Sequence, residues 1–120
     1  MSDRELLELA AKAAGIEYTW DTWANAPMVV SENGVDTDTW NPLVDDGDAL
    51  RLAVALRLVV HIWDNGESVS AAKTLPNGDD PPSGDLSSWS SADANSSGDL
   101  ASATRRAIVR AAAKIGQANG

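Results

Sequence analysis

The stretch from Trp40 to Leu58 constrains the fold more than any other part of the chain. It joins the end of a strand, a proline corner and an unusually apolar helix. Pro42 fixes its own φ and favours extended backbone before it, so the preceding strand should end at Asn41. Asp45 or Asp46 can then accept a hydrogen bond from an N–H group in the first helical turn. The rest of the chain must cover the helix that follows.

The helix expected over residues 49–58 is apolar on nearly every side. It carries two adjoining aliphatic faces, and the charges between Asp48 and Asp64 are confined to two arginines. A helix with this distribution is buried in a globular protein. We therefore expect it between a sheet and another helix, or in a subunit interface. The first face comprises Ala49, Leu52, Ala53 and Leu56, and the second comprises Leu50, Val54 and Leu58.

Three aspartates, Asp45, Asp46 and Asp48, stand together at the start of this helix. They suit the positive end of the helix dipole and the unpaired N–H groups there. A cation site is the alternative, but the spacing lacks the alternating ligands and distant glutamate of a calcium loop. We interpret the cluster as helix capping, and we expect no metal site and no cofactor.

Length and residue usage restrict the class of protein. The 120 residues suffice for a single domain over 1–120. The chain has no cysteine, which excludes a disulfide, a thiolate zinc site and a cysteine nucleophile. No apolar run approaches the roughly 20 residues that span a bilayer, and no signal peptide is recognisable. We expect a soluble protein of the bacterial cytosol, with no membrane partner.

The net charge of −9 is unevenly distributed. After Asp99 there are no acids, and the last segment contains Arg105, Arg106, Arg110 and Lys114. An acidic body repels phosphate, so nucleic-acid binding is disfavoured. We expect the basic segment to form ion pairs with the acidic body, or to meet an acidic partner surface.

Local patterns predict the elements before the central helix. The segment starting at Ser2 matches a capping box, and apolar residues then recur at helical spacing, so a helix is expected over 3–14 with Gly15 ending it. Extended runs flank residues 33–34, an Asn-Gly pair that favours a tight hairpin turn. A hairpin should therefore precede the central helix, with its first strand interrupted near Asn25.

Two more strands are expected over 59–63 and 67–75, and a last helix over 100–115 that Gly116 should end. The order α-β-β-α-β-β-α predicts an α+β fold, a small α-β-α sandwich with an antiparallel or mixed sheet and helices packed on it. His61, the only histidine, lies within an apolar strand. Without a serine and an orienting acid nearby, we interpret it as structural.

Residues 76–99 differ in composition from the rest. Proline, glycine, aspartate and serine dominate, and no periodicity is visible. This composition predicts a flexible insertion. Trp89 stands out within it, because a bulky ring in a polar loop either pins the loop to the body or is offered to a partner.

Two sequence stretches resemble a known family. Residues 40–54, from Trp40-Asn41-Pro42-Leu43 onward, and residues 103–113 are similar to signatures of the phage ABA sandwich domain family of small tailed-phage and prophage proteins, distantly like the NinX-type proteins. The resemblance extends over most of the chain outside 76–99. It implies an α-β-α arrangement and a phage or prophage origin, with no established activity. Val44 stands where a polar residue is usual, which leaves an apolar group on the surface.

Several functions follow as hypotheses. The first is a non-catalytic phage accessory protein that binds a host or defence component. The alternatives are an oligomeric small-molecule or nucleotide sponge, with Arg105 and Arg106 on phosphate, and an acidic DNA mimic. An enzyme is disfavoured because no catalytic constellation is visible. The candidate binding residues are Trp23, Trp40, Asn41, Trp89, Arg105 and Arg106.

Burial and assembly are predicted separately. Trp20, Trp23 and Trp40 can line one binding face, but core positions are favoured for Trp20, Trp40 and Trp63, since tryptophan usually buries most of its area. Alanine-rich faces on the central and last helices predict more apolar surface than one small domain covers. We therefore expect a homodimer or a higher oligomer.

Overall fold

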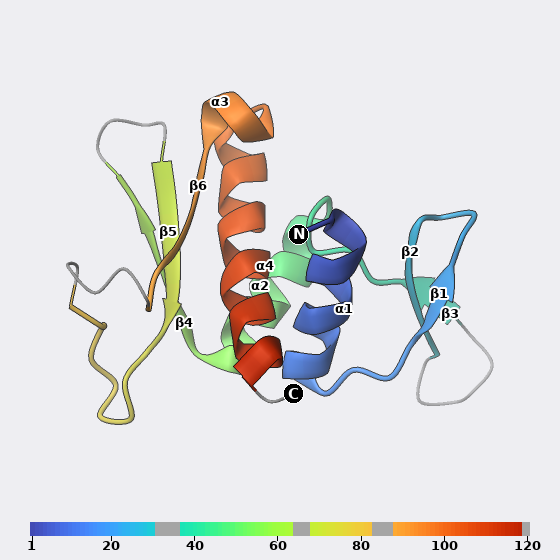
Figure 1. Ribbon diagram of the computed structural model, residues 1–120, viewed down its shortest axis with the longest axis horizontal. Coiled ribbons are helices and arrows are strands. Elements are labelled where there is room, and N and C mark those ends of the chain that lie inside the picture. Colours follow the sequence, from blue (N-terminus) through green and yellow to red (C-terminus); the bar gives the residue numbers. More distant parts are fainter. Residues whose placement is uncertain (31–36, 64–67, 83–87, 119–120) are drawn as a thin grey trace.

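The computed structural model describes residues 1–30, 37–63, 68–82 and 88–118 (Figure 1). Over these residues the chain is an α+β protein with four helices and two three-stranded antiparallel sheets. The elements are α1 (Asp3–Ala14), β1 (Thr19–Asp21), β2 (Ala26–Val30), β3 (Thr37–Thr39), α2 (Asp46–Leu56), β4 (Leu58–Ile62), β5 (Ser68–Lys73), β6 (Ser90–Asp93), α3 (Ala94–Ser97) and α4 (Leu100–Ala118).

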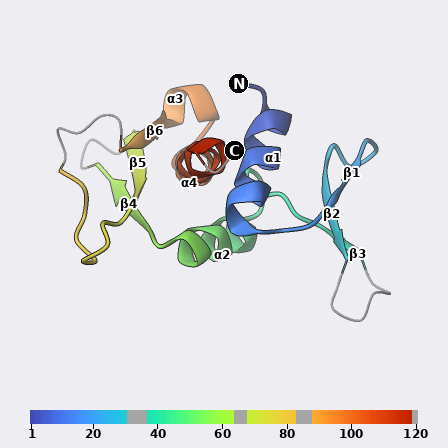
Figure 2. The same ribbon diagram turned by 60° about the horizontal axis from the view of Figure 1, so that its bottom comes forward.

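The longer helices form the middle of the molecule, with one sheet on each side. Figure 2 shows α4 nearly end-on beside α1 and α2, between the β1-β2-β3 sheet and the β4-β5-β6 sheet. The prediction of a single sheet within an α-β-α sandwich is wrong, because the strands form two sheets with the helices between them. The predicted order α-β-β-α-β-β-α also lacks β1, β6 and α3. The interruption near Asn25 is a chain reversal: its φ of 54° closes a turn that pairs β1 with β2.

The capping predictions for the first helix are confirmed. Ser2 Oγ accepts a hydrogen bond from the Glu5 N–H group at 3.2 Å, and α1 spans Asp3–Ala14. Gly15 has a φ of 71°, the left-handed conformation that commonly ends a helix. The hairpin before α2 is present as the antiparallel pair β2 and β3, while its predicted turn at residues 33–34 lies outside the described residues.

Helices α1 and α4 make the closest contact of the core. Leu7 and Ala11 of α1 and Val109 and Ala112 of α4 are all buried there. The predicted helix end at Gly116 is wrong, because α4 continues to Ala118. A Cβ atom at this glycine would lie 2.1 Å from the carbonyl oxygen of Leu9. The glycine therefore permits two helix backbones to touch, rather than terminating a helix.

The start of α2 is confirmed as predicted, but its burial is only half right. Asp45 caps the helix by accepting a hydrogen bond from the Asp48 N–H group at 2.7 Å. Arg57, with a φ of 57°, ends it after Leu56 and turns the chain into β4. The first apolar face is buried, whereas Leu50 and Val54 of the second face are 65% and 58% exposed. Helices α1 and α4 cover one side of α2, so the prediction that both faces are buried within the chain is wrong, and burial of the second face in a subunit interface stays a prediction.

The β4-β5-β6 sheet has one face on α4 and one face turned away from it. Val69 and Ala71 of β5 are buried against alanines of α4. Strand alternation then places Ser70 on the opposite face, beside its cross-strand partners His61 and Ser91. This second face, called the outer face below, carries small and polar side chains.

Part of the predicted flexible insertion is ordered structure. Within residues 76–99, β6 pairs with β5 along its length, and the short helix α3 follows it. The signal is a brief alternation in which Ser90 and Ala92 are buried while Ser91 and Asp93 are exposed. An alternation over four residues is too short to be recognised in a serine-rich segment, so the composition of the segment predicts a flexible insertion where a strand is present.

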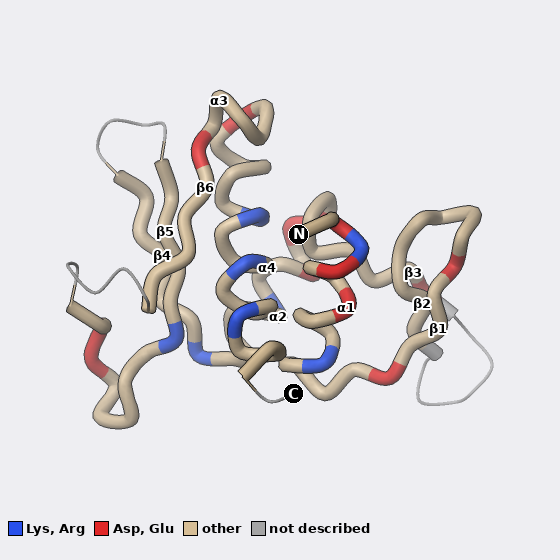
Figure 3. Tube along the Cα trace, viewed as in Figure 1, with Lys and Arg blue, Asp and Glu red and all other residues tan. Residues whose placement is uncertain are grey.

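The basic last helix forms ion pairs with acidic residues from the first half of the chain, as predicted. Figure 3 shows basic positions along α4, opposite acidic positions of α1 and of the α2 start. Arg106 lies 3.0 Å from Asp3, and Arg105 pairs with Asp46. None of the helices in the described ranges is long and apolar enough to cross a membrane.

Candidate functional site

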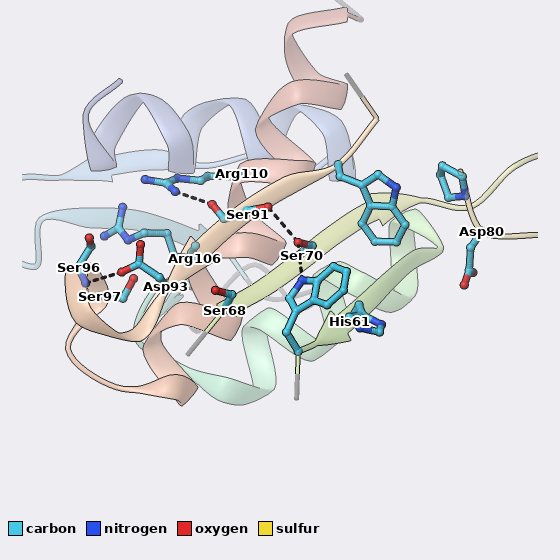
Figure 4. Close-up of a pocket in the computed structure, with 14 residues that line it drawn as sticks. His61, Ser68, Ser70, Asp80, Ser91, Asp93, Ser96, Ser97, Arg106 and Arg110 are labelled. Atoms are coloured by element: carbon cyan, nitrogen blue, oxygen red, sulfur yellow. Dashed lines mark hydrogen bonds between the residues drawn. The ribbon is translucent and has the colours of Figure 1, made fainter. Parts of the chain in front are cut away.

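A groove of about 780 Å³ runs over the outer face of the β4-β5-β6 sheet (Figure 4). Side chains on the outer face of the sheet form its base, and two arginines of α4 reach it past the edge strand β6. The lining residues are His61, Trp63, Ser68, Ser70, Asp80, Pro81, Trp89, Ser91, Ala92, Asp93, Ser96, Ser97, Arg106 and Arg110.

Hydroxyl groups form the floor of the groove. Ser70 and Ser91 face each other across the β5–β6 pair, and their Oγ atoms are 2.9 Å apart in a hydrogen bond. The indole N–H of Trp63 donates to Ser70 Oγ at 3.2 Å. Because these residues are small, they leave space over the sheet between the larger aromatic side chains.

Two indole rings and an imidazole stand around this floor. Trp63 is 44% exposed and meets the His61 ring edge-on, with 4.3 Å between centroids. Trp89 donates its indole N–H to the carbonyl oxygen of Pro82 at 3.1 Å. Both indoles are therefore held at their polar edge, which restricts ring rotation and leaves apolar ring surface toward the groove.

Charged groups lie at the α3 end of the groove. Asp93 Oδ1 accepts a hydrogen bond from the Ser96 N–H group at 2.7 Å, which caps α3. This backbone hydrogen bond, together with one from the Ser96 side chain and the charge of Arg110, lowers the pKa of Asp93 below its usual range. Asp93 is therefore a carboxylate at neutral pH. Arg110 donates to the Ser91 carbonyl oxygen at 2.6 Å.

The structure divides the six candidate binding residues among separate places. Trp89 and Arg106 line the groove. Trp23 lies in the β1–β2 turn and is 96% exposed, while Trp40 is buried in the main core. The six therefore do not form one surface.

The remaining two candidates hold local structure. Asn41 Oδ1 accepts a hydrogen bond from the Leu43 N–H group at 3.1 Å, and the Asn41 N–H donates to Asp48 at 3.0 Å. Arg105 donates to the Leu43 carbonyl oxygen at 2.9 Å and to Ser102 Oγ at 2.9 Å. Both residues join the proline corner to its neighbours.

The sequence interpretation missed most of the groove. The prediction of a core position for Trp63 is wrong, since this residue directly follows β4 and its half-exposed ring lines the groove. Trp20 is half-buried, under the guanidinium of Arg4 at 4.6 Å. The available signal was the alternation of serine with apolar residues over 68–71, which marks a sheet face that is not packed against a helix.

No metal site emerges within the described ranges, where no three His, Asp or Glu side chains gather in a way that would hold an ion. The Asp45–Asp48 cluster is instead used in capping: Asp48 accepts hydrogen bonds from Asn41 and from Arg51, the latter at 2.7 Å. The groove can bind a ligand through the hydroxyls of Ser70 and Ser91 and through the rings of Trp63, Trp89 and His61.

Compared with known proteins, the chain matches no protein-family model, no curated protein and no solved structure. The resemblance to the phage ABA sandwich domain family therefore stays a prediction.

Proposed function

We propose that the chain is a non-catalytic binding protein that holds a small molecule in the groove on the outer face of the β4-β5-β6 sheet. The groove itself supports this function, because it has about 780 Å³ of space, a floor of serine hydroxyls and two indoles fixed by hydrogen bonds. Small-molecule sites in proteins are mostly pre-formed concavities of roughly 300–1,000 Å³ with aromatic walls and a few placed polar groups.

The contacts of the groove residues support binding rather than catalysis. His61 lies against the Trp63 ring, and Ser70 Oγ is bonded to Trp63 and Ser91 rather than to a base. Asp93 is used to cap α3. A nucleophile activated by an adjacent base, the usual arrangement of covalent catalysis, is not formed among these described side chains.

The family resemblance implies a phage or prophage accessory protein that acts in the bacterial cytosol. The ligand is then a host or defence-related small molecule that the protein sequesters.

A nucleotide is expected from the sequence to bind Arg105 and Arg106 through its phosphate. Arg105 is engaged with the proline corner and with Asp46, so the groove offers Arg106 and Arg110 instead.

Equilibrium dialysis against a bacterial metabolite extract tests the proposal. Mass spectrometry of both chambers identifies any compound that accumulates with the protein. We expect enrichment with the wild type and with Trp23→Ala, and loss of enrichment with Trp89→Ala. Trp23→Ala is a matched control because it removes the same side chain far from the groove. The proposal fails if no compound accumulates, or if both variants retain it equally.

A second candidate function, binding of a host or defence protein, is favoured by Trp23. Its ring is almost fully exposed in the β1–β2 turn, where its N–H donates to Asp21 Oδ1 at 3.1 Å. Exposed tryptophans are enriched among residues that dominate protein interfaces. Pull-down from bacterial lysate should then recover a protein with wild type and Trp89→Ala but not with Trp23→Ala. Identical lanes for all three would contradict this function.

A further inference from the structure

Among the residues that the structure describes, the charges that line the groove cancel: two carboxylates, Asp80 and Asp93, are matched by two guanidiniums, Arg106 and Arg110. The guanidiniums already have partners, since Arg106 donates to Asp3 at 3.0 Å and Arg110 to a β6 carbonyl oxygen at 2.6 Å. Each guanidinium has five N–H donors, so a phosphate could bond to those that remain, but it would share the charge of Arg106 with Asp3 and meet the charged carboxylate of Asp93. An uncharged ligand meets no such repulsion.

The Ser70–Ser91 pair on the floor of the groove can still donate and accept hydrogen bonds. Two hydroxyls supply two O–H donors and four lone pairs. The Ser70–Ser91 bond uses one donor and one lone pair, and the Trp63 N–H uses another lone pair. Among the contacts of the described residues, one donor and two lone pairs therefore remain. Ligand hydroxyls, which also donate and accept, match this remainder better than a purely accepting or purely donating group.

The two indoles supply apolar contact without supplying polar groups to the ligand. The N–H groups of Trp63 and Trp89 are already bonded, so these rings present apolar surface, and the His61 ring meets that of Trp63 edge-on. A sugar ring has an apolar face of C–H groups and a rim of hydroxyls. It can therefore cover an indole with its face and reach the serine floor with its rim.

Resting on the proposed function, we infer that the groove binds a neutral saccharide. Its ring packs on the indole of Trp89 or Trp63, and its hydroxyls bond to the Ser70–Ser91 pair and to the carboxylate of Asp93. An uncharged nucleoside is the nearest competitor, because a base also stacks on indole rings.

Indole N–H signals in an NMR spectrum of the ¹⁵N-labelled full chain provide the test. The chain has five tryptophans, so each binding event can be assigned to particular rings. The titrants are neutral hexoses, N-acetylhexosamines and their short oligomers, with uridine, adenosine and inorganic phosphate as separate arms. We expect a saccharide to shift the Trp63 and Trp89 signals and to leave that of Trp23 unchanged.

Variants make the assignment specific. Trp89→Ala should weaken saccharide binding roughly tenfold, and Ser70→Ala about threefold to tenfold. Trp23→Ala should leave affinity unchanged. Circular dichroism confirms that each variant is folded before its affinity is compared.

The outcomes separate this inference from the proposed function. If a nucleoside shifts the Trp63 and Trp89 signals and no saccharide does, the saccharide inference is wrong while the groove remains a binding site. If saccharides shift only the signals of tryptophans outside the groove, or none of the titrants shifts any signal at millimolar concentration, the saccharide inference is also wrong. The dialysis experiment decides the proposed function independently of this panel.

Discussion

Replacing Gly116 with alanine should destabilise the protein, although alanine is the better helix former. Gly116 lies inside α4, where a Cβ atom would sit 2.1 Å from the Leu9 carbonyl oxygen and 2.9 Å from its carbon. Contacts of Cβ atoms below 3.0 Å are essentially never observed. The obstructing atoms are backbone, so no side chain can rotate away, and α1 and α4 must move apart.

The magnitude follows from two opposing terms. Alanine in place of glycine within a helix favours folding by about 1 kcal/mol. Extra atoms forced into a packed core cost about 1–3 kcal/mol, and more where backbone must shift. Because this contact joins two helices whose shared side is fully buried, the cost should exceed the gain. We expect the free energy of unfolding to fall by about 2 kcal/mol.

Gly47→Ala is the matched control. Gly47 lies in the first turn of α2, and a Cβ atom there would lie 3.1 Å from the guanidinium end of Arg51 and 3.3 Å from the capping carboxylate of Asp45. Both are ends of mostly exposed side chains, so this variant should be neutral or up to about 1 kcal/mol more stable. Urea unfolding followed by tryptophan fluorescence gives both values, provided that the m-value is unchanged. The packing argument is refuted if Gly116→Ala is as stable as the wild type or more stable.

Three further predictions concern charge and surface. Arg105→Ala should lower the free energy of unfolding by about 1–3 kcal/mol in urea, because its mostly buried guanidinium joins α4 to the Leu43 carbonyl oxygen and to Asp46 at the start of α2; an unchanged value would contradict this role. The pKa values of Asp93 and Asp99 are lowered, mainly by backbone N–H groups that they cap, so their stabilisation is present above the ordinary value of 3.8 and is lost as pH falls below it toward the lowered values. Asp93→Asn with Asp99→Asn should therefore flatten the decline of Tm between about pH 5 and pH 2, and an unaltered decline would count against these two residues. The exposed apolar pair Leu50 and Val54 predicts self-association: light scattering should show a mass above 12.6 kDa that Leu50→Lys with Val54→Lys reduces to 12.6 kDa, whereas a wild-type monomer would disprove it.

The sequence predicts local structure well where a capping group or a turn residue has one main use. Ser2 and Gly15 bound α1 as expected, and Asp45 caps α2. The sequence cannot assign Gly116, because a glycine late in a helix serves equally as a terminator or as a point of close approach. The position of α1 decides between these uses, and that position depends on tertiary packing.

The sequence also does not predict that the strands separate into two sheets. Each hairpin is predictable by itself, but nothing in a local pattern says whether two hairpins join. In the structure α1, α2 and α4 lie between them, and the exposed second face of α2 results from that arrangement. The apolar pattern of α2 indicates which residues can be buried, not which of them have a neighbour.

The groove was predicted only in part, through Trp89 and Arg106. Its floor consists of serines on β5 and β6, and serine is common in loops, so the pattern gave no reason to expect a binding surface. A core position is favoured for Trp63 because most tryptophans are buried. Its exposure depends on which face of the sheet packs against α4, and the pairing of β4 with β5 and the position of α4 determine that face.

A crystal structure of the full chain, grown after dialysis against the metabolite extract, would show whether the groove is a binding site. We expect the outer face of the β4-β5-β6 sheet to be open to a ligand, with electron density over Ser70 and Ser91 and against Trp63 or Trp89. Density confined to other parts of the surface, or an outer face packed against another part of the chain, would contradict it.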